Sequence, residues 1–493
     1  MPQLDSLPRL RRVLLWAAVL SGLLLAMLDQ TIVGTALPQI VRDLGGESMY
    51  VWGITAYLVP ATVLLPVFAR LSDRYGRQRM LLIGMSLFVL GSALCAIAQS
   101  MAQVATFRAV QGAGAAALEA LSFLLVAELS GPRRNAAAQA VLAGIMAFSF
   151  IAGPLIGGLL TDHVGWRWVF LVNVPLGVLA ITVVARVLPA ELGRSQGRET
   201  PLDIAGIAVL TSSLGLILVG LNQHLIEPSW FALRTGGAVA AGLVGAGLLV
   251  IIERRAESPV LPLRLLTQPV MVRLLVTGAT ATFGLYACVL LLPRYYQQTQ
   301  GVSATRSGLF IYPLLLGLLI AVNLGATVVA RRNAFRGTLL AANVAVALGA
   351  LGFTAFETRS PAALPLLLMA LIGIGVGPNL SGLQMAVQRT VRPMDLGAAM
   401  GALLLCRQLG GALSLAAAET VYVGQLGSGA SPEAATGTSI FVVAAAGAVI
   451  ATLALLTLRR GADRIPAPNP NPAASTPSST TAEHGRAVVS ATS

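Results

Sequence analysis

Charged and polar residues interrupt several stretches of this sequence that are otherwise apolar enough to cross a membrane. Asp29 lies in "LLAMLDQTIVGTALPQI", residues 24–40, and Arg108 lies in "FRAVQGAGAAALEA", residues 107–120. A charge at the centre of a bilayer costs at least about 2.5 kcal/mol, so such residues are usually paired or functional. A carboxylate there can carry a proton, because loss of water favours its neutral form. The candidates for proton coupling and for a substrate cavity are Asp29, Arg108, Gln111, Glu119 and Arg407.

Asp29 and Arg108 are expected at the same depth in the membrane. Asp29 lies about nine residues before the end of its apolar span near Pro38, and Arg108 about eight residues after the start of its own span near Ser100. At about 1.5 Å per helical residue, both lie roughly 12 to 14 Å below one surface. A carboxylate and a guanidinium at one level can pair, which lowers the cost of burying both. A purely structural pair, or an arginine that snorkels to the surface, is the alternative.

Glu119 and Arg407 extend this polar set. Glu119 follows Arg108 by eleven residues, about three helical turns, so the two project from nearly the same face, which also carries Gln111. Arg407 falls near the middle of a span in the second half of the chain, which has no obvious central carboxylate. The sequence therefore predicts a polar path in the first half and a cationic centre in the second.

The composition indicates the kind of elements that hold these residues. Of the 493 residues, 56% are hydrophobic and 11% are charged, with a mean hydropathy of +0.79, which is far from the composition of a soluble globular protein. A helix crosses a bilayer with about 20 apolar residues. Fourteen stretches meet this criterion: 13–38, 50–71, 80–99, 101–126, 136–160, 167–187, 203–222, 232–252, 268–292, 305–329, 337–356, 361–385, 397–420 and 438–458. The sequence thus predicts an all-α polytopic membrane protein.

The arginines predict how the chain crosses the membrane. The net charge is +13, and the chain contains arginine but no lysine. Of the 33 arginines, 25 fall on the same side as the N-terminus, six on the opposite side and two within spans. Positively charged loops stay in the cytoplasm, so we expect both termini there and take the arginines as a topology signal rather than a nucleic-acid site. Residues 1–12 are the expected cytoplasmic N-terminus, and residues 461–493 a disordered cytoplasmic tail.

Several kinds of chemistry are excluded by what the sequence lacks. Without lysine there is no phosphate-binding Gly-Lys-Ser/Thr loop and no Schiff base. The three cysteines have no disulfide or metal-ligand spacing, and none of the three histidines is placed in the middle of a span. We therefore expect no cofactor, no metal site and no enzymatic activity, and any proton coupling has to run through carboxylates.

Two further motifs indicate conformational change and close helix packing. In "ARLSDRYGRQRM", residues 69–80, an acid stands among arginines beside a glycine suited to a tight turn, which suggests a charge clamp at a moving interface. In "SFIAGPLIGGLL", residues 149–160, glycines permit close helix contact and a proline permits a bend. The residues concerned are Asp73, Arg74, Gly76 and Arg77 in the first motif, and Gly153, Pro154, Gly157 and Gly158 in the second.

These stretches together resemble the major facilitator superfamily, specifically its fourteen-helix drug:proton antiporter branch. The similar segments are residues 28–38, 69–79, 108–115 and 153–158, which match the motifs of the first helix, the loop after the second helix, the fourth helix and the antiporter-associated fifth helix. The departures include Gly34 where asparagine is usual, Ala69 in place of the first loop glycine and Gln78 in place of the loop lysine.

The resemblance implies both a fold and a function. The fold has two six-helix bundles, residues 13–187 and 268–458, around a central cavity, with two inserted helices in residues 203–252. The function is proton-coupled efflux of drugs or antibiotics through the cytoplasmic membrane of a bacterium. In that mechanism Asp29 alternates between a protonated and a substrate-engaged state, Arg108 tunes its pKa and relays the coupling, and Glu119 is a second proton site or a polar wall. The partners are a small-molecule drug or antibiotic, protons and the lipid bilayer, with no nucleic acid and no required oligomer.

Other functions are compatible with the same residues. A dedicated exporter of one self-made metabolite or antibiotic and a proton-coupled importer share this pattern, because a fold does not fix its substrate. A sensor that binds without transporting is a further class. A membrane-embedded enzyme would need a water-exposed nucleophile or a metal cluster, for which the sequence shows no spacing.

Overall fold

The computed structural model of the protein describes residues 9–188, 203–223, 232–256, 267–332, 335–355, 363–391 and 396–458. The first half comprises α2 (Arg9–Leu44), α3 (Trp52–Tyr75), α4 (Arg77–Ala96), α5 (Met101–His163), α6 (Arg167–Leu171) and α7 (Asn173–Val187). Next come α8 (Ile204–Gln223), a π-helical turn (Leu233–Gly237) and α9 (Ala238–Arg255). The second half comprises α11 (Pro269–Thr280), α12 (Phe283–Arg294), α13 (Ala304–Phe310), α14 (Tyr312–Arg332), α15 (Arg336–Gly352), α16 (Ala363–Thr390), α17 (Leu396–Gly427) and α18 (Pro432–Leu456).

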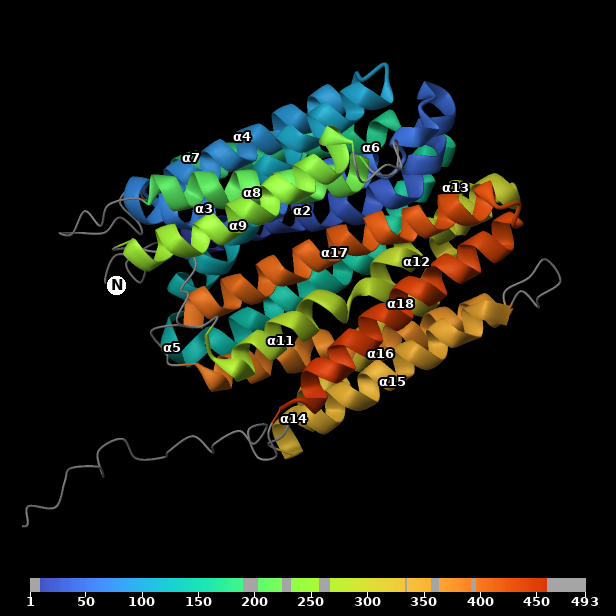
Figure 1. Cartoon of the computed structure of the whole chain (residues 1–493). Coiled ribbons are helices and arrows are strands. Elements are labelled where there is room, and N and C mark those ends of the chain that lie inside the picture. Colours follow the sequence, from blue (N-terminus) through green and yellow to red (C-terminus); the bar gives the residue numbers. More distant parts are fainter. Residues whose placement is uncertain are drawn as a thin grey trace, which may run out of the picture.

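The regular elements of the described chain are helices, which confirms the all-α prediction (Figure 1). Thirteen helical segments of the described ranges are long and apolar enough to cross a membrane, and Ala205–Gly220 within α8 is a shorter apolar helix at the place of the remaining predicted span. Helices suit this environment because backbone polar groups in lipid must be satisfied within the segment. The predicted tail, residues 461–493, lies outside the described residues.

Helix α5, from Met101 to His163, covers two of the predicted spans, 101–126 and 136–160. The two arms of α5 nevertheless run in opposite directions beside α2. In the first arm Arg108 contacts Asp29 and Ser122 contacts Val19, so this arm is antiparallel to α2. In the second arm Gly153 faces Thr31 and Gly157 faces Thr35, so this arm is parallel to α2. The two predicted spans therefore exist as antiparallel arms.

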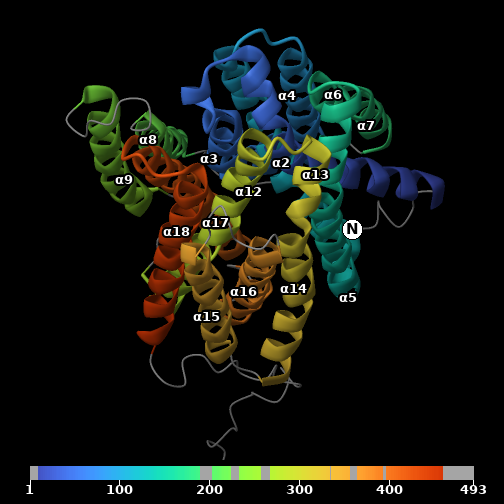
Figure 2. The same ribbon diagram turned by 90° about the vertical axis from the view of Figure 1, so that its right-hand side faces the viewer.

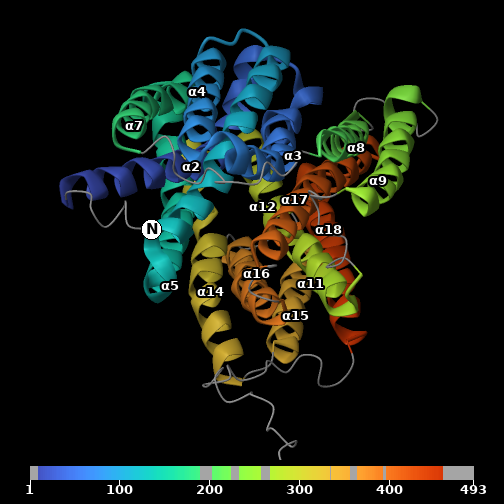
Figure 3. The ribbon, with the colours of Figure 1, turned by 90° about the vertical axis from the view of Figure 1, so that its left-hand side faces the viewer.

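The helices before and after the inserted pair form two groups, which we call the N-terminal half (α2–α7) and the C-terminal half (α11–α18). Figure 2 shows most of the first group, in blue to teal, on one side and most of the second, in yellow to red, on the other, while α5 extends beside α14. The inserted helices α8 and α9 lie together at the edge of the molecule (Figure 3). Helix α8 contacts α3 of the N-terminal half and α17 of the C-terminal half, so it bridges the two groups.

Five hydrogen bonds join the halves near one end of the bundle, where α2 ends and α3 begins, and we call this the closed end. They run from Ala304 and Thr305 to Asp162, from Gln297 to Thr35, from Tyr312 to Ile151 and from Arg294 to Glu47, at 2.8 to 3.1 Å. Arg294 also pairs with Glu419 of its own half at 2.8 Å and lies between the rings of Tyr50 and Tyr422. Contacts between the halves are therefore extensive at this end.

Candidate functional site

Asp29 lies at the centre of a buried polar network in the N-terminal half. Its side chain has no exposed surface, and that of Arg108 is 1% exposed. The Asp29 carboxylate forms an ion pair with Arg108 of α5 and accepts hydrogen bonds from the amides of Gln111, at 2.8 Å, and Asn173, at 3.0 Å. Both carboxylate oxygens are thus occupied, and the charge is held away from solvent.

The Arg108 guanidinium is held from several sides. Its Nε donates to the carbonyl of Gly53 at 3.3 Å, and one Nη donates to the side-chain oxygen of Gln111 at 2.9 Å. It also lies over the Tyr57 ring, 4.1 Å from the centroid, in cation–π geometry. Stacking and hydrogen bonding together compensate the loss of water around a buried guanidinium, which explains how α5 holds a full charge at this depth.

Three members of this network, Ser92, Asn173 and Tyr57, were not predicted from the sequence. Ser92 of α4 accepts hydrogen bonds from the Gln111 and Asn173 amides, both at 3.0 Å. Tyr57 donates to the backbone carbonyl of Ala26 on α2 at 3.0 Å. Asn173 could have been noticed as a polar residue within an apolar span, whereas Ser92 and Tyr57 are common residues in such helices and carry no distinctive pattern.

Glu119 is buried but takes no part in this network. It faces the C-terminal half, where the side chain of Gln408 on α17 interacts with its carboxylate. None of the ion pairs found among the described residues involves Glu119. The shared helix face predicted for Arg108 and Glu119 therefore leads to two different surroundings, one inside the N-terminal half and one between the halves.

Arg407 of α17 occupies a different kind of setting. Its side chain is half-buried and donates hydrogen bonds to two backbone carbonyls of α16, those of Asn379 and Leu380. Its Nε atom is buried without a partner, and the ion pairs of the described chain do not include it. The cationic centre expected in the second half is present, and no carboxylate of the described residues forms an ion pair with it.

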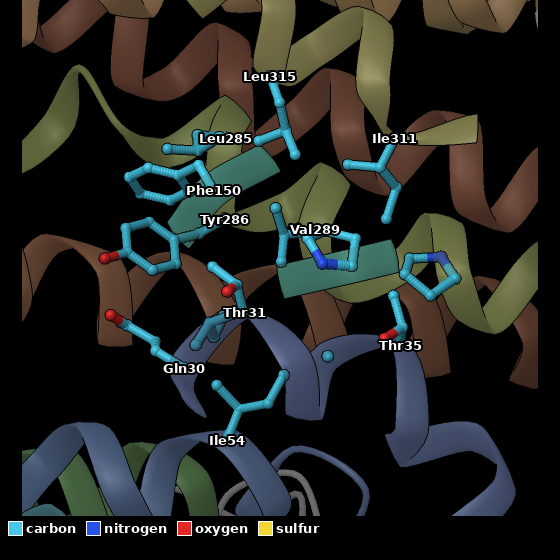
Figure 4. A pocket seen from close by; sticks show the side chains of 14 residues that line it. Gln30, Thr31, Thr35, Ile54, Phe150, Leu285, Tyr286, Val289, Ile311 and Leu315 are labelled. Carbon is cyan, nitrogen blue, oxygen red and sulfur yellow. The ribbon is translucent and has the colours of Figure 1, made fainter. Parts of the chain in front are cut away.

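A pocket lies between the halves (Figure 4). It is next to the buried network but on the other side of α2. Helix α2 turns Asp29 toward the N-terminal half and Gln30 toward this pocket. The polar edge is formed by Gln30 and by Tyr286 of α12, whose side chains interact. The lining residues are Gln30, Thr31, Gly34, Thr35, Ile54, Phe150, Pro154, Leu285, Tyr286, Val289, Pro293, Ile311, Leu315 and Leu415. The pocket is mainly apolar with a polar edge, as is usual for small-molecule sites.

The motif Gly153–Gly158 in the second arm of α5 packs against both halves. A Cβ added at Gly157 would lie 2.6 Å from the carbonyl oxygen of Ile32 on α2. One added at Gly158 would lie 2.7 Å from the backbone nitrogen of Thr305 at the start of α13. Pro154, which lines the pocket, meets Gly308 of α13. These small residues therefore allow the backbones of the two halves to approach at the closed end.

We expect Gly158→Ala to destabilise the contact between the halves by about 1–3 kcal/mol, because the added methyl group overlaps the α13 backbone. Gly144→Ala on the same arm is the matched control, since a Cβ there meets nothing within 4 Å. Thermal unfolding of both purified variants measures the difference. Equal melting temperatures for the two variants would contradict the assignment of Gly158 to this contact.

The motif after α3 is a turn between two helices rather than the longer predicted loop. Helix α3 continues to Tyr75 and α4 begins at Arg77, so that only Gly76, with φ of 94°, separates them. Asp73 and Arg77 form an ion pair at 2.9 Å. Arg74 lies over the ring of Tyr75, with 5.7 Å to its centroid. The charge pair predicted from the motif is present within the N-terminal half, and its role at a moving interface stays a prediction.

No group of three or more His, Cys, Asp or Glu side chains that could hold a metal ion occurs in the described part of the chain. The cysteines Cys95 and Cys288 are buried and Cys406 is partly buried, and all three are free. The site consists of a charge network, a half-buried arginine and an apolar pocket.

Comparison with known proteins identifies the family. Residues 19–415 match the model described as Major Facilitator Superfamily, and the chain therefore belongs to this family of transporters, which are not enzymes. It is 30% identical over 405 residues to "Multidrug transporter protein MdtP" of Bacillus subtilis, covering 82% of this chain and 74% of that protein. It is also 30% identical over 406 residues to "Multidrug resistance protein B homolog" of Mycobacterium tuberculosis, covering 80% and 73%.

The fold is shared with solved transporter structures at low sequence identity. A crystal structure of a D-xylose-proton symporter aligns with a TM-score of 0.61 at 13% identity, covering 88% of this chain and 96% of that one. A bacterial homolog of the human lysosomal transporter Spinster aligns with a TM-score of 0.60 at 13% identity, covering 91% and 96%. At this identity the likeness concerns the fold alone.

Proposed function

We propose that this protein is a proton-coupled exporter of amphipathic drugs or antibiotics that works by alternating access in a cytoplasmic membrane. Relatives named as multidrug transporters and resistance proteins support the substrate class. The observation that carries the proposal is the fully buried Asp29 network, in which a carboxylate, a guanidinium and two amides meet in the interior of the bundle. Intramembrane charges of this kind mark ion pathways and proton relays.

In the proposed cycle Asp29 binds a proton only after its ion pair with Arg108 loosens. A neutral carboxyl group no longer attracts the guanidinium, so protonation weakens the links from α2 to α5 and, through Asn173, to α7. Because Gln30 and Thr31 line the pocket directly beside Asp29 on α2, a small movement of this helix changes the pocket as well. Proton and substrate thus compete through one helix.

The closed end is the proposed outer gate. The arginine distribution of the sequence predicts that this end lies outside, and export requires it to open. Opening separates Arg294 from Glu47 and Asp162 from the start of α13. The Glu47 side chain is 66% exposed, so this part of the gate contributes about 1 kcal/mol or less and can open readily.

A transport screen tests the proposal. The gene is expressed in a host that lacks its own pumps, drug susceptibility is measured over a broad panel, and accumulation of the affected drugs is followed with and without an uncoupler. We expect resistance and low accumulation that the uncoupler reverses. Increased accumulation would identify an importer, and resistance to one compound alone would identify a dedicated exporter.

Glu119→Gln is expected to lower uncoupler-sensitive efflux several-fold without abolishing it. The substitution keeps the size of the side chain and its contact with Gln408 but removes a second group that can carry a proton between the halves. Efflux is measured in vesicles with an imposed pH gradient and normalised to folded protein. Glu433→Gln on α18 is the control, because Glu433 lies in the first turn of its helix and interacts with Tyr295 and Tyr422 of its own half. Equal effects of the two changes would remove Glu119 from the proposed mechanism.

A further inference from the structure

The two arginines that lie within predicted membrane spans are compensated very differently. Arg108 has a buried carboxylate, a ring and two further acceptors around it. Arg407 has two backbone carbonyls and, among the described residues, no acid. An arginine inside a membrane is costly, and a pair with an anion is the usual compensation. The C-terminal half therefore retains a positive charge that its described side chains leave uncompensated.

The residues around Arg407 do not supply the missing negative charge. Its acceptor Asn379 belongs to a neutral pair, in which the Asn379 amide donates to Asn343 at 3.0 Å. Its neighbour Gln408 is an amide that interacts with Glu119 of the facing α5. Glu119 is thus engaged by the residue next to Arg407 rather than by Arg407 itself.

Arg407 continues one wall of the pocket between the halves. On α17 it is followed at steps of four residues by Gly411 and Leu415. Leu415 lines the pocket, and the ring of Tyr286, which also lines it, lies against Gly411. Eight residues of helix span about 12 Å, so the guanidinium lies within one small molecule's length of the apolar lining. Along this length the wall is aliphatic at Leu415, aromatic at the Tyr286 ring and positively charged at Arg407.

This arrangement fits one chemical class of ligand. We propose that Arg407 binds the acid group of an amphipathic organic anion, such as a carboxylate, whose apolar body occupies the pocket beside Tyr286, Val289 and Leu415. The inference rests on the proposed function, because it takes this pocket to be the transport cavity. An arginine suits the task because its planar fork matches a carboxylate and its charge persists at all physiological pH values.

The proposal is tested by binding of three fluorescent probes that share a dansyl group to the full-length protein in lipid nanodiscs. Dansylglycine carries a carboxylate, dansylglycinamide is its neutral counterpart and dansylcadaverine is a cation. We expect dansylglycine to bind about tenfold more tightly than the amide, and Arg407→Gln to reduce this preference to about twofold or less. Arg407→Lys keeps the charge and is expected to retain part of the preference. Arg306→Gln, which removes an exposed arginine, is expected to leave it unchanged.

Three outcomes overturn the proposal: equal binding of the acid and the amide by the unaltered protein, tighter binding of the cation, or a preference that survives in folded Arg407→Gln. The comparison within the unaltered protein decides the matter even where the variant does not fold.

Uncoupler-sensitive efflux of the same probes separates the two proposals. Proton-driven export of dansylcadaverine without any acid preference would leave the proposed function standing and remove the anion site. Acid-selective binding without proton-driven export would support the anion site and contradict the proposed function.

Discussion

Replacing Asp29 with asparagine is expected to reduce proton-driven efflux to the level of vesicles without protein. Asparagine has nearly the same shape and can still accept hydrogen bonds from Gln111 and Asn173, but it cannot take up or release a proton. The variant therefore mimics the protonated state permanently. Exchange of substrate across the membrane without a proton gradient is expected to continue, because it needs no net proton movement.

The measurement uses reconstituted vesicles and the compound most affected in the susceptibility screen. A pH-sensitive dye inside the vesicles reports protons that move when this compound is added, and this signal is expected to disappear in Asp29→Asn. Asp43→Asn on the same helix is the matched control, since Asp43 is exposed and bonds to the Trp166 indole at the closed end. Proton movement that persists in Asp29→Asn would exclude Asp29 as the coupling residue.

Arg108→Gln is expected to have the largest effect on stability. The substitution leaves the Asp29 carboxylate buried with amide partners only and removes the stacking on Tyr57 and the bond to Gly53. Loss of one partner of a buried ion pair costs about 3–5 kcal/mol, because the remaining charge has lost its compensation. We expect a large fall in the apparent melting temperature in detergent and a lower yield of folded protein.

The double variant Asp29→Asn with Arg108→Gln separates charge from packing. Removing both charges leaves a neutral network of amides, so most of the lost stability is expected to return while proton coupling does not. Thermal unfolding of the four proteins forms a double-mutant cycle. If the double variant is as unstable as the sum of the two single variants, the ion pair contributes no coupling energy and the network is held mainly by packing.

The fold was largely predictable because lipid imposes a simple rule on the backbone. A segment of about 20 apolar residues in a membrane has to be a helix, so hydropathy alone placed nearly all the spans. The rule says nothing about details within and between the spans. The break at Ala281–Thr282 within the span Pro269–Thr299 and the short step from α3 to α4 depend on local packing and turn geometry. Hydropathy does not report either feature.

The site was predictable only in part, for a related reason. Asp29, Arg108 and Arg407 stood out because charges are rare in apolar spans, and counting along the helices placed the first two at one depth. The depth of a residue in the membrane does not determine which neighbouring helix its side chain faces. The spacing of eleven residues places Glu119 on the same helix face as Arg108, yet Glu119 interacts with Gln408 across the interface between the halves.

The sequence by itself determined that the chain is an all-α membrane protein, which of its charges lie within the membrane and which residues permit close helix contact. Each of these follows from the transfer energy or size of single side chains. Only the tertiary structure decided which helices meet. It paired Asp29 with Arg108 and closed their network with Ser92 and Asn173. It also placed Arg407 against two carbonyls of α16 and, within the described residues, away from any acid. Both results depend on contacts between residues far apart in the chain.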